Sequence, residues 1–190
     1  MTLVLCSQNP HKLEELRAAL PEWTIELLEA DDYPPEDRDT YYANARIKAR
    51  HGRELGPPDA WVVGEDSGIE VDALGGEPGV RSARWAESGR QHLHLLERLG
   101  DEPDRHARMI AHLVAIAPDG RELDAAGVLE GEIAAEPRGT GGFGYDPVFV
   151  PEGETRTVAE LGDGWKRANS HRGRAAEALR AALESSIAAS

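Results

Sequence analysis

The N-terminal half of the chain alternates between short apolar runs and longer stretches in which apolar residues recur every three or four positions. Short, partly β-branched apolar runs are typical of buried strands, and the wider spacing is typical of amphipathic helices. The predicted strands are residues 2–6, 24–28 and 60–64. One predicted helix starts at Pro10 after the cap Asn9, and the other covers residues 40–54 after the cap Thr40.

The C-terminal half has a different pattern. Residues 106–117 and 121–134 flank Pro118-Asp119-Gly120, a sequence typical of a tight turn between antiparallel strands. A helix is predicted before this hairpin, at residues 88–99, and another after it, beginning near Arg172. Strand–helix pairs followed by a long hairpin and a helix predict an α/β protein with a mixed, twisted sheet and flanking helices.

Composition and charge narrow the class of protein. At 190 residues and 20.6 kDa, the chain is expected to form one domain, residues 1–190, with two joined lobes. A net charge of −14 argues against a nucleic-acid partner, which requires a basic surface. No run approaches the roughly 18 apolar residues of a membrane span, and no secretory signal is recognisable. With a single cysteine, Cys6, these features predict a cytoplasmic protein without a membrane partner.

Two adjacent acids, Glu65 and Asp66, follow the apolar run that stops at Gly64, and residues 69–72 then alternate like a half-exposed strand. We therefore expect a strand to end at Gly64 and the acids to form a corner. Neighbouring carboxylates need a cation or donors to offset their desolvation, and Mg²⁺ with a polyphosphate fits such a corner. One acid would bind the metal while the other activates water. The alternative is a turn with two solvated acids.

A second cluster, Ser7, Asn9 and Lys12, lies where the first strand meets the first helix. A hydroxyl, an amide, an ammonium and the free N–H groups of a helix start all suit phosphate oxygens. The alternative is ordinary N-capping by Asn9 beside a solvated Lys12. The glycine-rich phosphate loop of P-loop enzymes is absent from the sequence.

Two further clusters lie near the C-terminus. Residues 139–146 form a glycine-rich loop in which Phe143 can stack on a flat ring, although a flexible loop anchored by Tyr145 is the alternative. Ser170 can cap the last helix, but the cations His171 and Arg172 are unfavourable at a helix N-terminus. A bound acceptor, such as a purine carbonyl or a phosphate, resolves that conflict, and Lys166 can join them.

Taken together, these clusters resemble the inosine triphosphatase family, the Ham1-like pyrophosphatases of non-standard purine nucleoside triphosphates. The resemblance covers the chain from Leu3 to about Leu183, and the motifs occur in the family's order. The matching stretches are Ser7–Glu15, Asn44–Ala49, Glu65–Gly68, Leu74–Gly79, Gly139–Pro147 and Ser170–Gly173. Any one of them is weakly specific, but their combination in order is highly specific.

The resemblance implies Mg²⁺-dependent hydrolysis of ITP, dITP and XTP to the monophosphate and pyrophosphate. It also implies an elongated, two-lobed fold with a central cleft, and a homodimer. Asp66 would be the general base, and Glu65 and Asp66 would bind the metal. The implied substrate contacts are Ser7, Asn9, Lys12, Lys48 and Ser67 at the phosphates, Phe143, Gly144, Tyr145 and Asp146 in the base pocket, and Lys166, His171 and Arg172 at the purine edge.

The purine preference has a physical basis in this reading. Hypoxanthine and xanthine carry a carbonyl acceptor at C6, where adenine carries an amino donor. Donors from Arg172 or His171 would pair with the carbonyl and be left unpaired by adenine. Each buried unpaired group costs about 1–3 kcal/mol, which is enough to discriminate between the bases.

One departure from the family pattern concerns the metal. The resemblance implies a metal-binding glutamate immediately before Asn44, where this chain has Ala43, and a loop glycine where it has Arg38. The loop acids that are candidates to replace the glutamate are Glu36, Asp37 and Asp39. Two alternatives therefore stay open: a nucleotide-binding homologue that has lost turnover, and a Maf-like pyrophosphatase with another base specificity.

Overall fold

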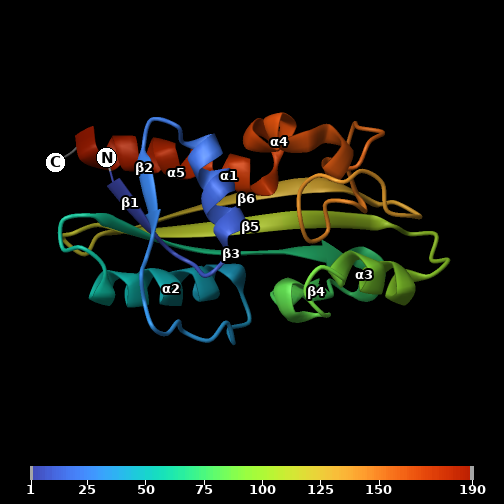
Figure 1. Cartoon of the computed structure of the whole chain (residues 1–190), viewed down its shortest axis with the longest axis horizontal. Helices are drawn as coiled ribbons and strands as arrows, with labels where there is room; N and C mark the ends of the chain where they lie inside the picture. The colour runs from blue at the N-terminus through green and yellow to red at the C-terminus, as the bar shows by residue number, and fades with distance from the viewer. Residues whose placement is uncertain (1, 189–190) are drawn as a thin grey trace.

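The computed structural model describes residues 2–188 and consists of one mixed sheet with helices on both faces (Figure 1). The sheet has the order β2-β1-β3-β5-β6-β7, with the short β4 paired to β3. Its strands are β1 (Thr2–Cys6), β2 (Thr24–Leu27), β3 (Trp61–Val71), β4 (Pro78–Gly79), β5 (His106–Ile116), β6 (Glu122–Ile133) and β7 (Phe149–Pro151). β1 runs parallel to β2 and β3, whereas β3, β5, β6 and β7 are antiparallel. The predicted mixed α/β fold is confirmed.

Five α-helices cover the sheet within the described residues. They are α1 (Pro10–Ala19), α2 (Tyr41–Leu55), α3 (Gln91–Leu99), α4 (Val158–Asn169) and α5 (His171–Ala188). In Figure 1, α1, α4 and α5 lie on one side of the sheet, and α2 and α3 lie on the other. No helix within residues 2–188 has a segment long and apolar enough to cross a bilayer.

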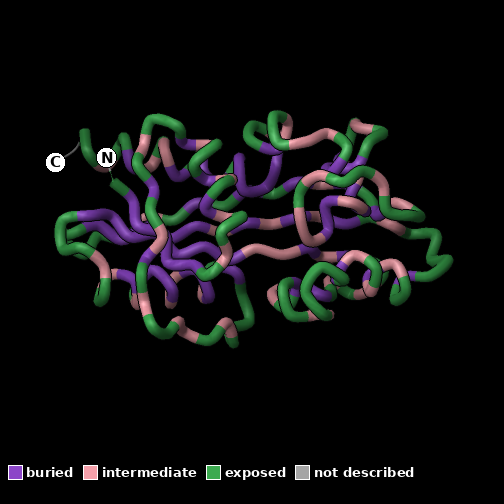
Figure 2. The backbone as a smooth tube through the Cα atoms, viewed as in Figure 1, coloured by how far each residue is buried: buried purple, intermediate pink, exposed green. Residues whose placement is uncertain are grey.

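Two hydrophobic clusters give the molecule its elongated shape. One joins β1 and the adjoining halves of β3 and β5 to α1 and α5, and it includes Leu5, Leu113 and Leu179. The other lies toward the opposite ends of β3, β5 and β6 and includes Leu95 and Phe149. Because the three long strands run through both clusters, the two lobes share one continuous sheet, whose buried positions alternate with more exposed ones (Figure 2).

β3 does not end where the sequence suggested. The prediction that the strand stops at Gly64 is wrong, because β3 continues through both acids to Val71. Gly64 is required for packing rather than for a turn: a Cβ there would lie 2.0 Å from the Ala45 carbonyl oxygen of α2. Since successive side chains of a strand point to opposite faces, Glu65 and Asp66 lie on opposite faces of the sheet rather than in one corner.

The remaining elements are close to the prediction, although α4 and the short strands β4 and β7 were not predicted. Asn9 caps α1 and Thr40 caps α2, and the hairpin of β5 and β6 is present. Helix α4 starts with a capping box formed by Thr157 and Glu160. Its pattern was obscured because Gly162 adopts a non-helical conformation, with φ of 78°, and kinks the helix.

The close contact at Gly64 generates a stability prediction. We expect Gly64→Ala to lower the free energy of unfolding by about 1–3 kcal/mol, because the added methyl group overlaps the α2 backbone. Gly164→Ala is the matched control, since a Cβ there meets no atom within 4 Å. That substitution should be neutral or raise stability by up to about 1 kcal/mol. Urea unfolding of both variants is the measurement, and equal effects would contradict the packing role of Gly64.

Candidate active site

A cleft of about 1040 Å³ opens where β1 meets α1, beside the middle of β3. Every residue predicted to contact substrate lines it, and so does Asp66. These residues are Ser7, Asn9, Lys12, Lys48, Ser67, Phe143, Gly144, Tyr145, Asp146, Lys166, His171 and Arg172. Glu65 does not line the cleft, because it is fully buried behind the strand.

The junction of β1 and α1 forms one end of the site. Asn9 Oδ1 accepts a hydrogen bond from the His11 N–H (3.0 Å), and Ser7 Oγ accepts one from the Asn9 N–H (3.1 Å). N-capping by Asn9 is therefore real, but the alternative of a solvated Lys12 is wrong. The Lys12 side chain is 12% exposed and its Nζ lies 2.5 Å from Glu65 Oε2. A helix N-terminus with a positioned ammonium group is suited to bind an anion.

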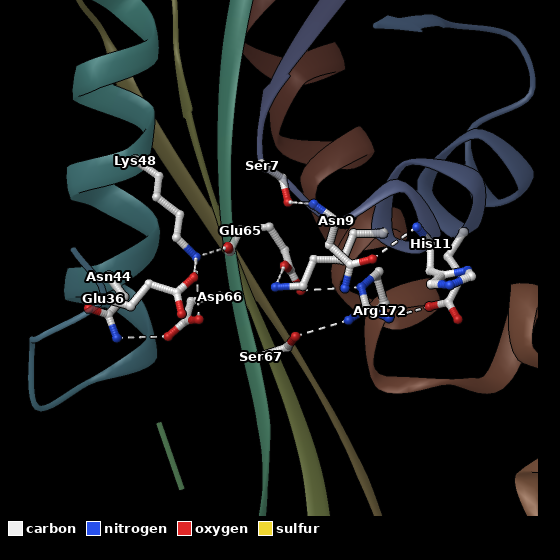
Figure 3. Close-up of polar contacts among 12 residues, drawn as sticks. Ser7, Asn9, His11, Glu36, Asn44, Lys48, Glu65, Asp66, Ser67 and Arg172 are labelled. Carbon is white, nitrogen blue, oxygen red and sulfur yellow. Dashed lines mark hydrogen bonds and ion pairs between the residues drawn. The ribbon is translucent and has the colours of Figure 1, made fainter. Parts of the chain in front are cut away.

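Asp66 faces α2 on the other side of β3 (Figure 3). Its carboxylate accepts a hydrogen bond from Asn44 Nδ2 (2.9 Å), and Lys48 Nζ lies 3.5 Å from the other oxygen. Lys48 also forms an ion pair with Glu36 from the loop before α2. Burial raises the pKa of the Asp66 carboxyl, although Lys48 and Lys12 act to lower it. The carboxylate is thus fixed in orientation at the cleft wall and retains more basicity than an ion pair alone would leave it.

Glu65 is held on the opposite face by two cations. Lys12 Nζ lies 2.5 Å from one carboxylate oxygen, and Arg172 Nε lies 3.2 Å from the other. Although burial acts to raise it, these cations hold the pKa of Glu65 well below its usual range. The expected metal corner shared by Glu65 and Asp66 is therefore wrong in its geometry, since the strand separates the two carboxylates. The predicted metal contact of Glu65 has no support from its position.

The glycine-rich loop forms the other end of the site. Asp146 accepts hydrogen bonds from the Phe143 N–H (2.8 Å) and from Lys166 Nζ (2.7 Å). Gly142 has a φ of 71°, and a Cβ there would lie 2.1 Å from the Asp146 carboxylate, so the turn requires glycine. Tyr145 donates to the Ser82 carbonyl (2.9 Å) and so anchors the loop, as the alternative interpretation proposed.

The Phe143 ring is surrounded by groups that suit a flat, polar ligand. Lys166 Nζ lies 4.9 Å and Arg172 Cζ lies 5.7 Å from the ring centroid. The His11 ring stacks on Phe143, with centroids 5.1 Å apart and planes 19° apart. An aromatic face beside buried cations can stack on a base and present donors to its edge.

The start of α5 combines a cap with two buried basic side chains. Ser170 Oγ accepts a hydrogen bond from the Gly173 N–H (3.0 Å), so Ser170 caps α5. The His171 ring is buried, and its Nδ1 atom has no hydrogen-bond partner among the described residues. Burial, reinforced by the neighbouring Arg172, lowers the pKa of His171 to about 3. The imidazole is therefore neutral at physiological pH, which removes part of the expected charge conflict at this helix start.

Arg172 is engaged by the protein itself. Its guanidinium donates to Glu65 Oε1 and to Ser67 Oγ (2.9 Å), and it forms an ion pair with Glu15. Arg172 thus connects α5 to β3, through Glu65 and Ser67, and to α1, through Glu15. Its purine-reading role stays a prediction.

Two further residues complete the site without having been predicted from the sequence. Glu15 forms ion pairs with both Lys166 and Arg172, and Asn44 is fully buried against Asp66. A signal was present for each. Glu15 lies three positions after Lys12 on the same helix face, and Asn44 is a polar residue on the apolar face of α2 beside Ala45.

Comparison with known proteins shows extensive similarity. Residues 3–182 match the model of the Ham1 family. A dITP/XTP pyrophosphatase of Symbiobacterium thermophilum is 45% identical over 181 residues, which cover 91% of this chain and 90% of the relative. One of Deinococcus deserti is 41% identical over 186 residues, with coverages of 95% and 88%. The Ham1 protein structure of Staphylococcus aureus superposes with a TM-score of 0.85 at 33% identity, and the match covers 98% of this chain and 100% of that one. The HAM1 protein structure of Coxiella burnetii superposes with the same TM-score at 36% identity and covers 97% of this chain and 99% of that one.

The buried neutral histidine generates a prediction about pH. Below pH 6.5 the unfolded chain protonates His171, whereas the folded protein, with a pKa of about 3, does not. Acidification from pH 7.5 to 5.0 should therefore lower the free energy of unfolding of the wild type by about 2 kcal/mol through His171, and His171→Gln should not show this loss. Urea unfolding at both pH values measures the difference. His106→Gln, which removes a half-exposed ring, is the control, and parallel losses in wild type and His171→Gln would refute the prediction.

Proposed function

Because the chain belongs to the Ham1 family, we propose that it hydrolyses ITP, dITP and XTP to the corresponding monophosphate and pyrophosphate. It is an enzyme of the kind that its relatives' name, dITP/XTP pyrophosphatase, describes. The observation that carries the proposal is one cleft with an anion-binding helix start, a fixed carboxylate and an aromatic ring beside buried cations. These three parts match the phosphates, the attacked bond and the base of a purine nucleotide.

The residues of the cleft suggest how the reaction is assisted. The N-terminus of α1 and the Lys12 ammonium bind phosphate oxygens, which places the triphosphate beside β3. Asp66 then accepts a proton from the attacking water, while the hydrogen bond from Asn44 keeps its carboxylate oriented. Ser67 lines the cleft one residue further along the strand and can contact the substrate.

We include Mg²⁺ in the proposal, because the donors around Asp66 suit it. Glu36 and Asp66 both contact Lys48 and both line the cleft, so two carboxylates converge on one position. Within residues 2–188, no group of three or more histidine, cysteine or acidic residues is arranged so that it could hold a metal ion by itself. Mg²⁺ nevertheless binds through one or two carboxylates plus substrate phosphates. Glu36 would therefore take the place that Ala43 leaves without a ligand. When bound, the ion neutralises phosphate charge.

The end of the cleft around Phe143, called the base end below, supports a preference for purines with a C6 carbonyl. Lys166 and Arg172 are the donors that lie beside the Phe143 ring, and the neutral His171 lines the same cleft. Adenine presents an amino group where hypoxanthine presents an acceptor. It would leave such a buried donor unpaired, at a cost of about 1–3 kcal/mol. Uracil and thymine also carry a carbonyl acceptor, so it is membership of the Ham1 family, rather than the donors at this end, that speaks against the Maf-like alternative.

The experiment that tests the function is pyrophosphate release from ITP, dITP, XTP, GTP and ATP across a Mg²⁺ titration. We expect rapid release from the first three only.

Asp66→Asn should lower kcat by about 10²–10⁴-fold without loss of binding, because the general base is removed. Glu36→Gln should need more Mg²⁺ and recover activity at saturation. Binding of ITP by the wild type without release at any Mg²⁺ concentration would refute the enzymatic proposal.

We further propose a cytoplasmic homodimer. The cytoplasmic location follows from the substrates, since nucleoside triphosphates are made and consumed there. The dimer is supported by an apolar patch on the sheet face that α2 covers, where Val128 on β6 is paired with Ile110 on β5 and Tyr42 of α2 contacts the neighbouring His112. Val128 is 37% exposed and Tyr42 39% exposed, although both are large apolar side chains on a structured surface.

The dimer proposal predicts the effect of one added charge. Val128→Arg places a cation beside Ile110 on this face and should shift the protein to monomers in sedimentation equilibrium. Ile187→Arg, at an exposed position near the end of α5, is the control and should leave the mass unchanged. A monomeric wild type, or a dimeric Val128→Arg, would contradict this use of the patch.

A further inference from the structure

A row of alternating charges runs from one end of the cleft to the other. It consists of Lys12, Glu65, Arg172, Glu15, Lys166 and Asp146, in that order. The two longest ion pairs are Glu65–Arg172, at 3.2 Å, and Lys166–Asp146, at 2.7 Å. The row therefore joins the phosphate end of the site to the base end through direct contacts.

Glu65 is the member of the row that contacts no open space. It is 0% exposed and does not line the cleft, whereas both of its partners do. The strand backbone separates it from Asp66, and Figure 3 shows the two side chains on opposite sides of β3. Glu65 therefore acts on a ligand in the cleft only through Lys12 and Arg172.

We propose that Glu65 is a positioning residue that holds Lys12 in register with Arg172, so that the base and the phosphates are placed as one unit. This inference rests on the proposed function, because it takes Lys12 to contact phosphate. The two partners depend on Glu65 to different degrees. Arg172 retains Glu15 and Ser67 when Glu65 is neutralised, whereas Glu65 is the sole ion-pair partner of the Lys12 ammonium among the described residues.

Loss of the ion pair between Glu65 and Lys12 should therefore lower the turnover rate more than the binding affinity. A Lys12 released from Glu65 keeps its charge and still attracts phosphate, but its four-carbon stem no longer has a fixed direction. Loss of alignment at a reacting centre costs rate rather than affinity. A merely structural loosening of the site would instead weaken binding and turnover together.

The test is Glu65→Gln in the full chain, with Mg²⁺ and ITP for turnover and inorganic tripolyphosphate for binding. We expect kcat to fall by about tenfold or more, while the Kd of tripolyphosphate stays within about threefold or becomes tighter. Glu70→Gln is the matched control, because Glu70 lies on the same strand and pairs with Arg108 outside the cleft. An unchanged kcat, or a kcat loss accompanied by an equal loss of affinity, would overturn the positioning role.

A double-mutant cycle with Lys12→Gln gives a second, independent criterion. If Glu65 acts through Lys12, adding Glu65→Gln to Lys12→Gln should lower kcat by less than about threefold further, and a multiplicative loss would overturn the inference. Should Glu65→Gln fail to fold, Glu65→Asp replaces it; this keeps the charge but withdraws it from Lys12 by one methylene. It is expected to show the same kcat loss with retained affinity.

The wild-type assay separates this inference from the function on which it rests. A wild type that releases no pyrophosphate overturns the proposed function and the inference with it. An active wild type whose Glu65→Gln variant turns over equally fast overturns the positioning role alone.

Discussion

The site depends on the alternation of side chains along one central strand. β3 runs without interruption through two adjacent acids, so it presents Glu65 to α1 and α5 and Asp66 to α2. Neither carboxylate is tolerated in the interior without compensation, and each therefore has its own cation, Lys12 on one face and Lys48 on the other. The positions of both lysines follow from this requirement.

Close approach of helices to the sheet makes these contacts possible. Gly64 on β3 allows α2 to lie against the strand, and Gly127 on β6 does the same for α5, where a Cβ would lie 2.1 Å from the His171 carbonyl oxygen. With side chains at these two positions the helices would stand further off. Asn44 and Arg172 would then fall short of the acids that they contact, because hydrogen bonds weaken steeply with distance.

The end of the cleft around Phe143 combines ion pairing with the burial of a neutral side chain. His171 is enclosed beside Arg172 and stays neutral, while Lys166 keeps its charge because Asp146 and Glu15 surround it. The compensated cations Lys166 and Arg172 beside Phe143, with the neutral imidazole of His171 in the same cleft, offer directional donors. Such a surface suits the edge of a base, whereas the phosphate end suits an anion.

Local patterns were sufficient to predict the first strand, the caps Asn9, Thr40 and Ser170, and the hairpin, because each depends on neighbours in sequence. The residues that line the cleft were implied by the resemblance to a family. Local patterns were insufficient for Gly64, which resembles a strand end in sequence and is a helix contact in space. They also missed α4, whose periodicity is broken at Gly162. The partners of Glu65, and hence its separation from Asp66, come from segments up to 107 residues away. These partners are determined by tertiary packing. Because β3 continues through both acids, their side chains point to opposite faces, and the helices packed on each face, α1 and α5 on one and α2 on the other, supply the partners.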